Sequence, residues 1–400
     1  RSGLCRAQAQ AAMAAPLQSF GHVLQDPVIW WQALEQAFAG LDLTGLTVRA
    51  LAIDGTSGTI LPVAADGRPL GLASMYNDVA EPEHVARVEA AAPPETAARG
   101  ATSPLARAFA CEASAPRILH QADWIMGRLC GRFDVSDENN ALKTGYDPVA
   151  RRWPAWIATT GFDVVRLPQV VAAGTRVGTI LPAMAQAFRL PADTAVVTGT
   201  TDGCAAFLAS GASEDGDGVT SLGTTLTLKL LSATPVFAPA FGIYSHRIGE
   251  QWLAGGASNT GGGVLASFFS REQMAALSAR IDPAKPTGLD YYPLTKPGER
   301  FPVNDPALPP RLAPRPADDA QFLQGLLEGI ARIEAEAYAK LAELGASKLS
   351  SIRSLGGGAA NAAWSAIRAR ALKVPAVEAA SSDAAMGTAR LAWRGIGHHA

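Results

Sequence analysis

The chain has 400 residues, of which 48% are hydrophobic and 18% are charged, and its formal net charge is −2. This length exceeds what one hydrophobic core normally serves, so we expect two domains. The balanced charge offers no basic field for nucleic acid, and no apolar run approaches the roughly 18 residues that cross a bilayer. These properties favour a soluble globular enzyme over a protein that binds nucleic acid or spans a membrane.

The four cysteines, Cys5, Cys111, Cys130 and Cys204, lie far apart in the sequence. They show neither CxxC spacing nor the Cys/His spacing of a zinc site. The sequence therefore predicts free thiols in a reducing cytoplasm rather than a disulfide framework or a metal centre.

The first elements are a helix and two strands. Apolar residues at helical spacing predict an amphipathic helix over 28–40. Strands are expected over 47–53 and 59–63, on either side of the Gly/Thr/Ser turn 54–58. The turn residues are those that a tight connection between strands requires.

The next predicted elements are two helices, over 118–130 and 182–189. Between them, the stretch 134–147 is polar and typical of a loop.

A short apolar run begins at Ala195 and ends at a Thr/Gly turn, which leaves Asp202 where an Ala-rich helix begins. An Asp at the start of a helix is ordinarily an N-cap. Two glycine-rich turns follow, at 218–225 and 355–364, each beside an apolar strand. A carboxylate followed by two such turns favours the alternative, a catalytic base near a nucleotide site.

The second half of the chain begins with an expected hairpin over 219–231, where Leu226, Leu228 and Leu230 alternate with polar residues. Residues 283–317 are rich in proline and charge and are typical of a long surface loop.

A long helix is expected to begin near Asp318 or Asp319 and to end at Gly345, with a capping residue at each end. The last part of the chain is predicted as strand, glycine turn, helix, strand and helix. Strands and helices mixed in this order indicate an α/β architecture. The similarity of 52–59 to 220–225 favours two domains built on one plan, while a shared preference of tight turns for Gly and Thr is the alternative.

A series of short motifs covers almost the whole chain, at 53–58, 121–124, 136–146, 198–203, 221–225, 255–259, 356–364 and 383–390. In this order they resemble the FGGY carbohydrate kinases, within the actin and hexokinase superfamily. Residues 54–59 together with 75–78 are most similar to the D-ribulose kinase branch of that family, found in plants and cyanobacteria.

The resemblance implies an α/β fold of two ribonuclease H-like domains flanking a deep cleft. Residues 1–209 plus 383–400 would form the N-terminal, sugar-binding domain, and residues 210–382 the C-terminal, nucleotide-binding domain. In the family the ketose lies at the bottom of the cleft and ATP lies along the second domain.

The sequence departs from the family at its beginning. FGGY kinases open with a hairpin of the form strand-Asp-Phe-Gly-Thr-Ser-Gly, whose Asp helps to hold magnesium, whereas this sequence opens at Arg1-Ser2-Gly3. We therefore expect that hairpin to be missing and assign no metal ligand. The turn 54–58 is an alternative candidate for it, but the preceding helix at 28–40 favours the sugar side.

The resemblance assigns four residues to the reaction itself. Asp202 would be the general base that accepts the proton of the attacking sugar hydroxyl, and it would also orient the sugar. Ser57 would bind a sugar oxygen, with an ordinary turn serine as the alternative. Gly223 and Thr224 would offer a backbone N–H and a hydroxyl to phosphate oxygens, with a simple hairpin turn as the alternative.

The adenosine site is expected on the last glycine turn. Gly357 and Gly358 would flatten one wall, Asn361 would bind the base and the Trp364 ring would cover it. Gly256, with its neighbours Gly255 and Asn259, would lie beneath the nucleotide, with a structural bend as the alternative. A dinucleotide fingerprint is disfavoured because the chain has no GxGxxG.

The sequence thus predicts a cytoplasmic kinase that uses ATP and Mg²⁺ to phosphorylate a ketopentose, with D-ribulose converted to D-ribulose 5-phosphate. The alternatives are a kinase for xylulose or another ketose or polyol, a catalytically silent sugar-binding member, and an actin-like nucleotide-binding protein. The expected partners are small molecules, and the expected state is a monomer or homodimer.

Overall fold

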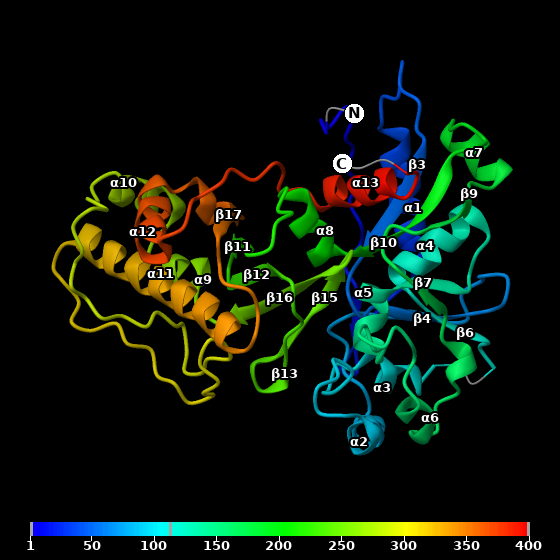
Figure 1. Ribbon diagram of the computed structural model, residues 1–400, viewed down its shortest axis with the longest axis horizontal. Coiled ribbons are helices and arrows are strands. Elements are labelled where there is room, and N and C mark those ends of the chain that lie inside the picture. The colour runs from blue at the N-terminus through cyan, green and yellow to red at the C-terminus, as the bar shows by residue number, and fades with distance from the viewer. Residues whose placement is uncertain (1–2, 112–113, 398–400) are drawn as a thin grey trace. The chain divides into compact units, whose positions relative to one another are not determined.

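The computed structural model describes residues 3–111 and 114–397 (Figure 1). The chain divides into two compact units: unit 1 is Arg1–Ala209 with Asp383–Ala400, and unit 2 is Ser210–Ser382. Arg1 and Ser2, on which the expectation of a missing hairpin rests, lie outside the described residues. Within the described part, no helix is both long enough and apolar enough to cross a membrane.

The described strands of unit 1 form three sheets. One is antiparallel, with strand order β1-β2-β5-β4-β6, and consists of β1 (Leu17–Ser19), β2 (His22–Gln25), β5 (Ala73–Ser74), β4 (Ile60–Val63) and β6 (Arg117–His120). The second has the order β3-β10-β9, with β3 (Ala50–Gly55), β10 (Ala195–Thr201) and β9 (Arg176–Thr179). The third is the parallel pair β7 (Val135–Asp137) and β8 (Gln169–Val171).

The helices of unit 1 connect and cover these sheets, and α4 and α13 both contact β3 and β10. They are α1 (Pro27–Ala39), α2 (Pro82–Ala91), α3 (Pro104–Ala108), α4 (Gln121–Cys130), α5 (Glu138–Ala141), α6 (Trp156–Thr159), α7 (Pro182–Phe188), α8 (Asp202–Ala209) and α13 (Ala384–Arg394), with short 3₁₀ turns η1 (Leu142–Thr144) and η2 (Val164–Arg166).

Local sequence explains where several of these helices begin. Asp26 caps α1 by accepting a hydrogen bond from the Val28 N–H, and Pro27 fits the first helical position. Asp383 caps α13 in the same way. The buried face of α1 carries Trp30 and Trp31, which join the core of unit 1.

Unit 2 is built on one five-stranded sheet of order β15-β16-β12-β11-β17. Its strands are β15 (His246–Ile248), β16 (Gln251–Ser258), β12 (Leu226–Ser232), β11 (Asp217–Leu222) and β17 (Ser351–Leu355). All pairs are antiparallel except β11 with β17, which is parallel. A small hairpin of β13 (Phe237–Ala238) and β14 (Ile243–Tyr244) flanks the sheet.

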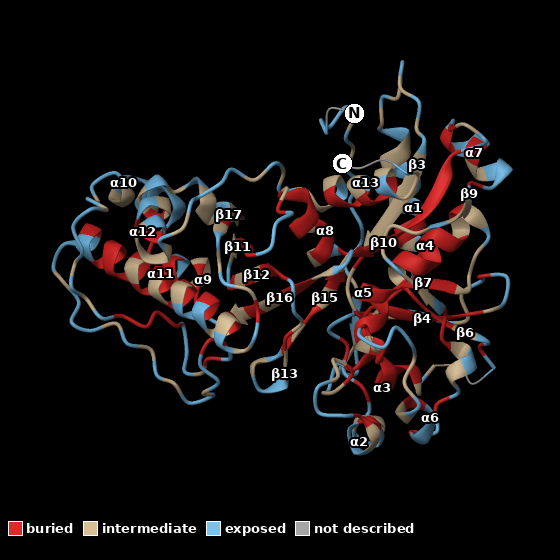
Figure 2. Cartoon of the chain, in the orientation of Figure 1, coloured by how far each residue is buried: buried red, intermediate tan, exposed pale blue. Residues whose placement is uncertain are grey.

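The helices of unit 2 are α9 (Gly262–Ala266), α10 (Arg271–Ser278), α11 (Asp319–Glu343) and α12 (Ala362–Leu372), with 3₁₀ turns η3 (Pro239–Phe241) and η4 (Gly357–Ala360). Figure 2 shows buried and exposed residues alternating along α11, because one stripe of this helix faces the core. Phe322, Leu326, Ile330 and Ile333 form that stripe, and each is at most 1% exposed.

Most of the expected elements are confirmed. The helices expected over 28–40 and 182–189, the hairpin over 219–231 and the long helix capped at Asp318 are all present. The described cysteines form no disulfide. Residues 283–317 contain no regular helix or strand, but Tyr291 and Phe301 within them are fully buried.

Three expectations were wrong. Residues 117–120 form strand β6, so the helix expected from 118 begins only at Gln121. The strand expected between α12 and α13 is reduced to a single bridge between Ile352 and Ala376. The expected loop 134–147 contains β7, α5 and η1 and is largely buried, because its polar side chains hydrogen-bond to one another.

Candidate active site

Asp202 follows β10, a strand of unit 1 that is buried along its whole length. Asp202 itself, at the start of α8, is exposed. Its Oδ1 atom accepts a hydrogen bond from the Gly203 N–H at 2.6 Å, as an N-terminal helix residue does. The carboxylate is thus held at a rigid strand end while its second oxygen remains able to accept a proton.

A glycine determines how β10 reaches this point. The parallel pairing of β10 with β3 is interrupted between Val197 and Thr200. A Cβ at Gly199 would lie 1.7 Å from the carbonyl oxygen of Ile53, which no side chain could tolerate. Because the pairing resumes at Thr200 with Asp54, the ends of the two strands lie side by side.

Asp54, at the end of β3, is electrostatically coupled to Asp202. Burial raises the pKa of Asp54 above its ordinary value, and the negative charges of Asp202 and Asp383 raise it further. A hydrogen bond with the Thr388 side chain opposes this increase. The strand ends therefore carry the exposed Asp202 carboxylate and the half-buried Asp54 carboxylate, whose pKa lies above its ordinary value.

The turn after β3 contains Ser57. Gln121 fixes this turn by accepting hydrogen bonds from the Thr56 N–H and hydroxyl at 2.9 and 3.0 Å. The Ser57 hydroxyl oxygen is buried and has no hydrogen-bond partner among the described residues. Since buried hydroxyls are nearly always hydrogen-bonded, this one is suited to a ligand oxygen.

A second turn, at 75–78, lies against the Ser57 turn. The Tyr76 N–H donates to the Thr59 hydroxyl at 3.1 Å. The Tyr76 side chain is 53% exposed, and Asn77 is also exposed. The Lys143 side chain lies beside the Ser57 turn, because a Cβ on Gly58 would be 3.6 Å from the Lys143 Cδ. Residues 75–78 are part of a predicted motif, but these side chains were not predicted as site residues, because their exposure is created only by the fold.

In unit 2, Gly223 and Thr224 form the turn between β11 and β12. Their carbonyls accept hydrogen bonds from the Gly262 and Gly263 N–H groups at 2.8 and 2.9 Å. A Cβ at Gly262 would lie 2.8 Å from the Gly223 oxygen, so the close approach depends on glycine. The Thr224 side chain is exposed.

The third glycine turn follows β17 and packs on the same strand end. A Cβ at Gly356 would lie 3.0 Å from the Leu222 oxygen, and one at Gly358 would lie 2.8 Å from the Leu222 Cβ. By contrast, a Cβ at Gly357 would meet nothing within 4 Å. The three glycine turns of unit 2 therefore meet around Leu222 and leave open backbone, which suits the close approach of phosphate oxygens.

In the structure, Asn361 caps a helix and Trp364 packs in the core of unit 2. Asn361 caps α12 by accepting from the Trp364 N–H at 3.0 Å, and it donates to the Ser278 hydroxyl at 2.8 Å. The Trp364 ring is 2% exposed and lies in the core, where a Cβ on Gly358 would be 2.4 Å away. Contact of either side chain with a base stays a prediction.

Gly256 also has a packing role. A Cβ there would lie 2.5 Å from the Phe301 ring, which fills the core of unit 2. Gly255 approaches the carbonyl of Leu228 on the neighbouring strand, and Asn259 binds the carbonyl of Gly298. These contacts fit the alternative prediction for these residues, a structural bend. Their contact with a nucleotide stays a prediction.

No three His, Cys, Asp or Glu side chains come together as a metal site in the described parts of the chain. Magnesium commonly binds through one or two carboxylates and the phosphates of a nucleotide. Asp54 and Asp202 are the coupled carboxylates that would fit such an ion.

Known proteins resemble this chain in sequence and in fold. Residues 218–396 match the C-terminal domain of the FGGY family of carbohydrate kinases. Among solved structures, a xyloylose kinase from Brucella ovis superposes with a TM-score of 0.83 at 23% identity, over 98% of this chain and 86% of that one. A xylulose kinase from Rhodospirillum rubrum gives 0.82 at 21%, over 98% and 84%.

A glycerol kinase from Plasmodium falciparum, solved with ADP, gives a TM-score of 0.80 at 14% identity, over 96% of this chain and 83% of that one. These superpositions show a shared fold. The expected fold class, α/β with two domains, is therefore confirmed.

Proposed function

We propose that the protein is an ATP-dependent sugar kinase that phosphorylates a ketopentose, with D-ribulose as the substrate and D-ribulose 5-phosphate as the product. The observation that carries the proposal is the parallel pairing of β3 and β10, in which Gly55 lies beside Thr201. The Ser57 turn and Asp202 therefore leave the same end of one sheet, where ligands of α/β folds bind.

The chemistry of these groups matches phosphoryl transfer to an alcohol. The sugar's terminal hydroxyl would give its proton to Asp202 while its oxygen bonds to the γ-phosphorus of ATP and ADP departs. The open backbone at Gly223 and Gly357, with the Thr224 hydroxyl, would receive the phosphates. Magnesium bound with ATP would neutralise phosphate charge.

Ser57 would supply a hydrogen bond to a sugar oxygen, because its buried hydroxyl has no partner among the described residues. Tyr76 and Asn77, exposed on the adjoining turn, would cover the sugar and bind its hydroxyls. Unit 1 would thus be the sugar-binding domain and unit 2 the nucleotide-binding domain.

A second candidate substrate is D-xylulose, because two of the similar solved structures are xylulose-type kinases. D-Ribulose is preferred on the resemblance of residues 54–59 and 75–78 to the D-ribulose kinase branch. The two sugars differ only in the configuration at one carbon, so the same groups would perform either reaction.

The test is ADP release from the purified protein with ATP, Mg²⁺ and a panel of D-ribulose, D-xylulose, L-ribulose and glycerol. We expect the highest kcat/KM with D-ribulose. A higher value with D-xylulose would reassign the substrate, and no sugar-dependent ADP release with any member would refute the kinase function.

A further inference from the structure

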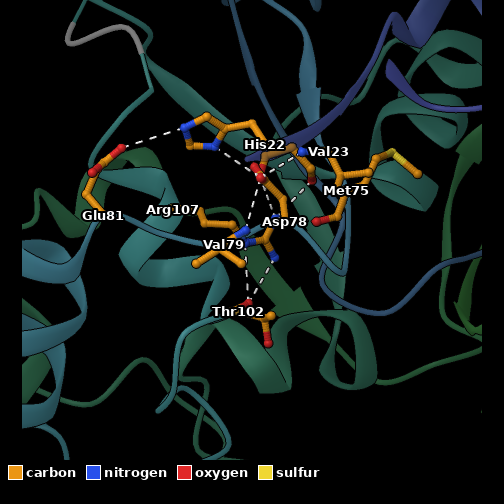
Figure 3. Close-up of polar contacts among 9 residues, drawn as sticks. His22, Val23, Met75, Asp78, Val79, Glu81, Thr102 and Arg107 are labelled. Carbon is orange, nitrogen blue, oxygen red and sulfur yellow. Dashed lines mark hydrogen bonds and ion pairs between the residues drawn. The ribbon is translucent and has the colours of Figure 1, made fainter. Parts of the chain in front are cut away.

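Arg107 is an almost fully buried cation of unit 1, and the proposed phosphoryl transfer does not use it. It lies on the short helix α3 and is 3% exposed. Its guanidinium donates to the Met75 carbonyl at 2.9 Å and to the Thr102 carbonyl at 3.2 Å (Figure 3). It also donates to the Ser74 carbonyl at 3.0 Å and to the Gly58 carbonyl. One side chain thus joins the Ser57 turn to the strand that leads into the Tyr76 turn.

No carboxylate is among the hydrogen-bond partners that the described residues offer to Arg107. Burial lowers the pKa of Arg107 to about 10, and the charge of Asp78 opposes this decrease, so the group is still a cation at neutral pH. Burying a charge without a directly paired counter-ion is costly, and an apolar side chain fills a core more cheaply. We therefore attribute the presence of Arg107 to the backbone carbonyls that its five N–H donors hold together.

Asp78 anchors the far end of the same segment. Its carboxylate accepts hydrogen bonds from the Val23 and Val79 N–H groups at 2.9 and 3.0 Å, and His22 lies 3.1 Å away (Figure 3). The Ser74 hydroxyl donates to Asp78 at 2.6 Å and accepts from Arg107 at 2.6 Å. The Ser74 hydroxyl thus links the Arg107 guanidinium to the Asp78 carboxylate.

The exposed Tyr76 and Asn77 lie between these two anchors. The carbonyl of Met75 is bound by Arg107, and Asp78 is buried and fully bonded. On the other side of the guanidinium, the carbonyl of Gly58 belongs to the residue that follows Ser57. The guanidinium therefore bridges the Ser57 and Tyr76 turns, beside the direct hydrogen bond from the Tyr76 N–H to the Thr59 hydroxyl.

We infer that Arg107 is a positioning residue that fixes the spacing of the Ser57 and Tyr76 turns and thereby determines which ketose the site accepts. The inference rests on the proposed sugar-kinase function for its substrate class. Arg107 touches no substrate in this account; it acts through Gly58, Ser74 and Met75.

The test is Arg107→Lys, which keeps the charge and most of the stem but supplies a single donor atom in place of the fork. The matched control is Arg99→Lys, because Arg99 also donates to backbone carbonyls, those of Glu89 and Ala92, away from the two turns. We expect the KM for D-ribulose to rise at least tenfold in Arg107→Lys, with the KM for ATP within twofold, and the preference for D-ribulose over D-xylulose to fall. Arg99→Lys should leave all three within twofold of wild type.

Unchanged sugar KM and unchanged sugar preference in Arg107→Lys would overturn the inference. A fall in melting temperature accompanied by equal increases in both KM values would do so too, because that pattern is a general structural effect. If Arg107→Lys does not fold, Ser74→Ala, which removes only the linking hydroxyl, should raise the sugar KM about threefold without changing the KM for ATP; no change would refute the inference.

A measurement without substrate separates this inference from the proposed function. Amide hydrogen exchange should accelerate at residues 57–59 and 76–78 in Arg107→Lys and not in Arg99→Lys. If wild type phosphorylates no sugar but this local acceleration is seen, the kinase proposal fails and the positioning role survives. If wild type is active and exchange at both turns is unchanged in Arg107→Lys, the positioning role is refuted while the kinase proposal stands.

Discussion

The two units support their exposed sites with different kinds of buried polar contacts. In unit 1, the segment behind β10 is a network of single hydrogen bonds: Asn139 donates to the Thr200 hydroxyl at 3.0 Å, and Asn140 donates to Asp137 at 2.5 Å. In unit 2, one fully buried ion pair joins α11 to α12, where Arg368 binds Glu334 through two bonds of 2.6 and 2.7 Å.

The difference follows from what each site presents. Unit 1 exposes the Asp202 carboxylate at a strand end, while the buried Asp137 carboxylate accepts hydrogen bonds from Asn139 and Asn140 and burial raises its pKa to about 7. Unit 2 presents mainly backbone at its glycine turns, so its core can hold a full charge pair beneath β11. Thr220 on that strand donates to Glu334 at 2.6 Å and so links the pair to the sheet.

The largest expected effect is on the ion pair. Arg368→Met would leave Glu334, which is 0% exposed, without its counter-ion, and should lower the unfolding free energy of unit 2 by about 3–5 kcal/mol. Native-state hydrogen exchange of α11 measures this loss. The control is Arg280→Met, which breaks the exposed pair with Asp318 and should cost at most about 1 kcal/mol. Equal effects of the two variants would contradict the role given to the buried pair.

The next effect is a pH dependence in unit 1. Burial raises the pKa of Asp137 to about 7, and the charge of Asp123 adds to this, against hydrogen bonds from Asn139 and Asn140. The folded state therefore binds more protons than the unfolded state between about pH 4 and pH 7. The contribution of Asp137 to stability is present at low pH and is lost as pH rises through 7.

Asp137→Asn should remove this dependence. Relative to wild type, the variant should gain up to about 4 kcal/mol of unfolding free energy as pH increases from 4 to 7, and gain nothing more above that range. Urea denaturation of both proteins at a series of pH values measures the difference. A difference that is flat from pH 4 to 8 would show that Asp137 has an ordinary pKa.

The smallest of the three effects on stability tests the pairing of β10 with β3. Gly199→Ala would push β10 away from the Ile53 carbonyl and should lower the unfolding free energy by about 1–3 kcal/mol. It should also lower turnover about 100-fold, because Asp202 would be displaced. Gly71→Ala is the control, since its Cβ would meet only Pro62 at 3.7 Å. Normal turnover in Gly199→Ala would show that catalysis does not depend on the pairing of β10 with β3.

Periodicity and capping residues predicted the elements whose stabilisation is local. The long helix from Asp319, its buried stripe and the β11–β12 hairpin followed from apolar spacing and from Asp318 as N-cap. Periodicity failed at 134–147, because that segment is buried through polar contacts such as Asp137 with Asn140, which an apolar pattern does not register.

The site was predictable to a similar degree. The position of Asp202 at a strand–helix junction followed from the sequence and is seen in the structure, while its catalytic role stays a prediction. The surroundings of Gly256 and Asn361 were not predictable, because their partners Phe301 and Ser278 are distant in the sequence. The unpartnered Ser57 hydroxyl and the Arg107 fork likewise depend on contacts that only the folded chain creates.

The most direct test of the account is the turnover of Asp202→Asn with ATP and D-ribulose. Asn keeps an oxygen to accept from the Gly203 N–H but cannot accept the sugar's proton, so kcat should fall by about 10²–10⁴-fold while ATP affinity stays within twofold. Asp163→Asn, at another exposed capping Asp, should leave kcat unchanged. A kcat for Asp202→Asn near that of wild type would contradict the assignment of Asp202 as the base.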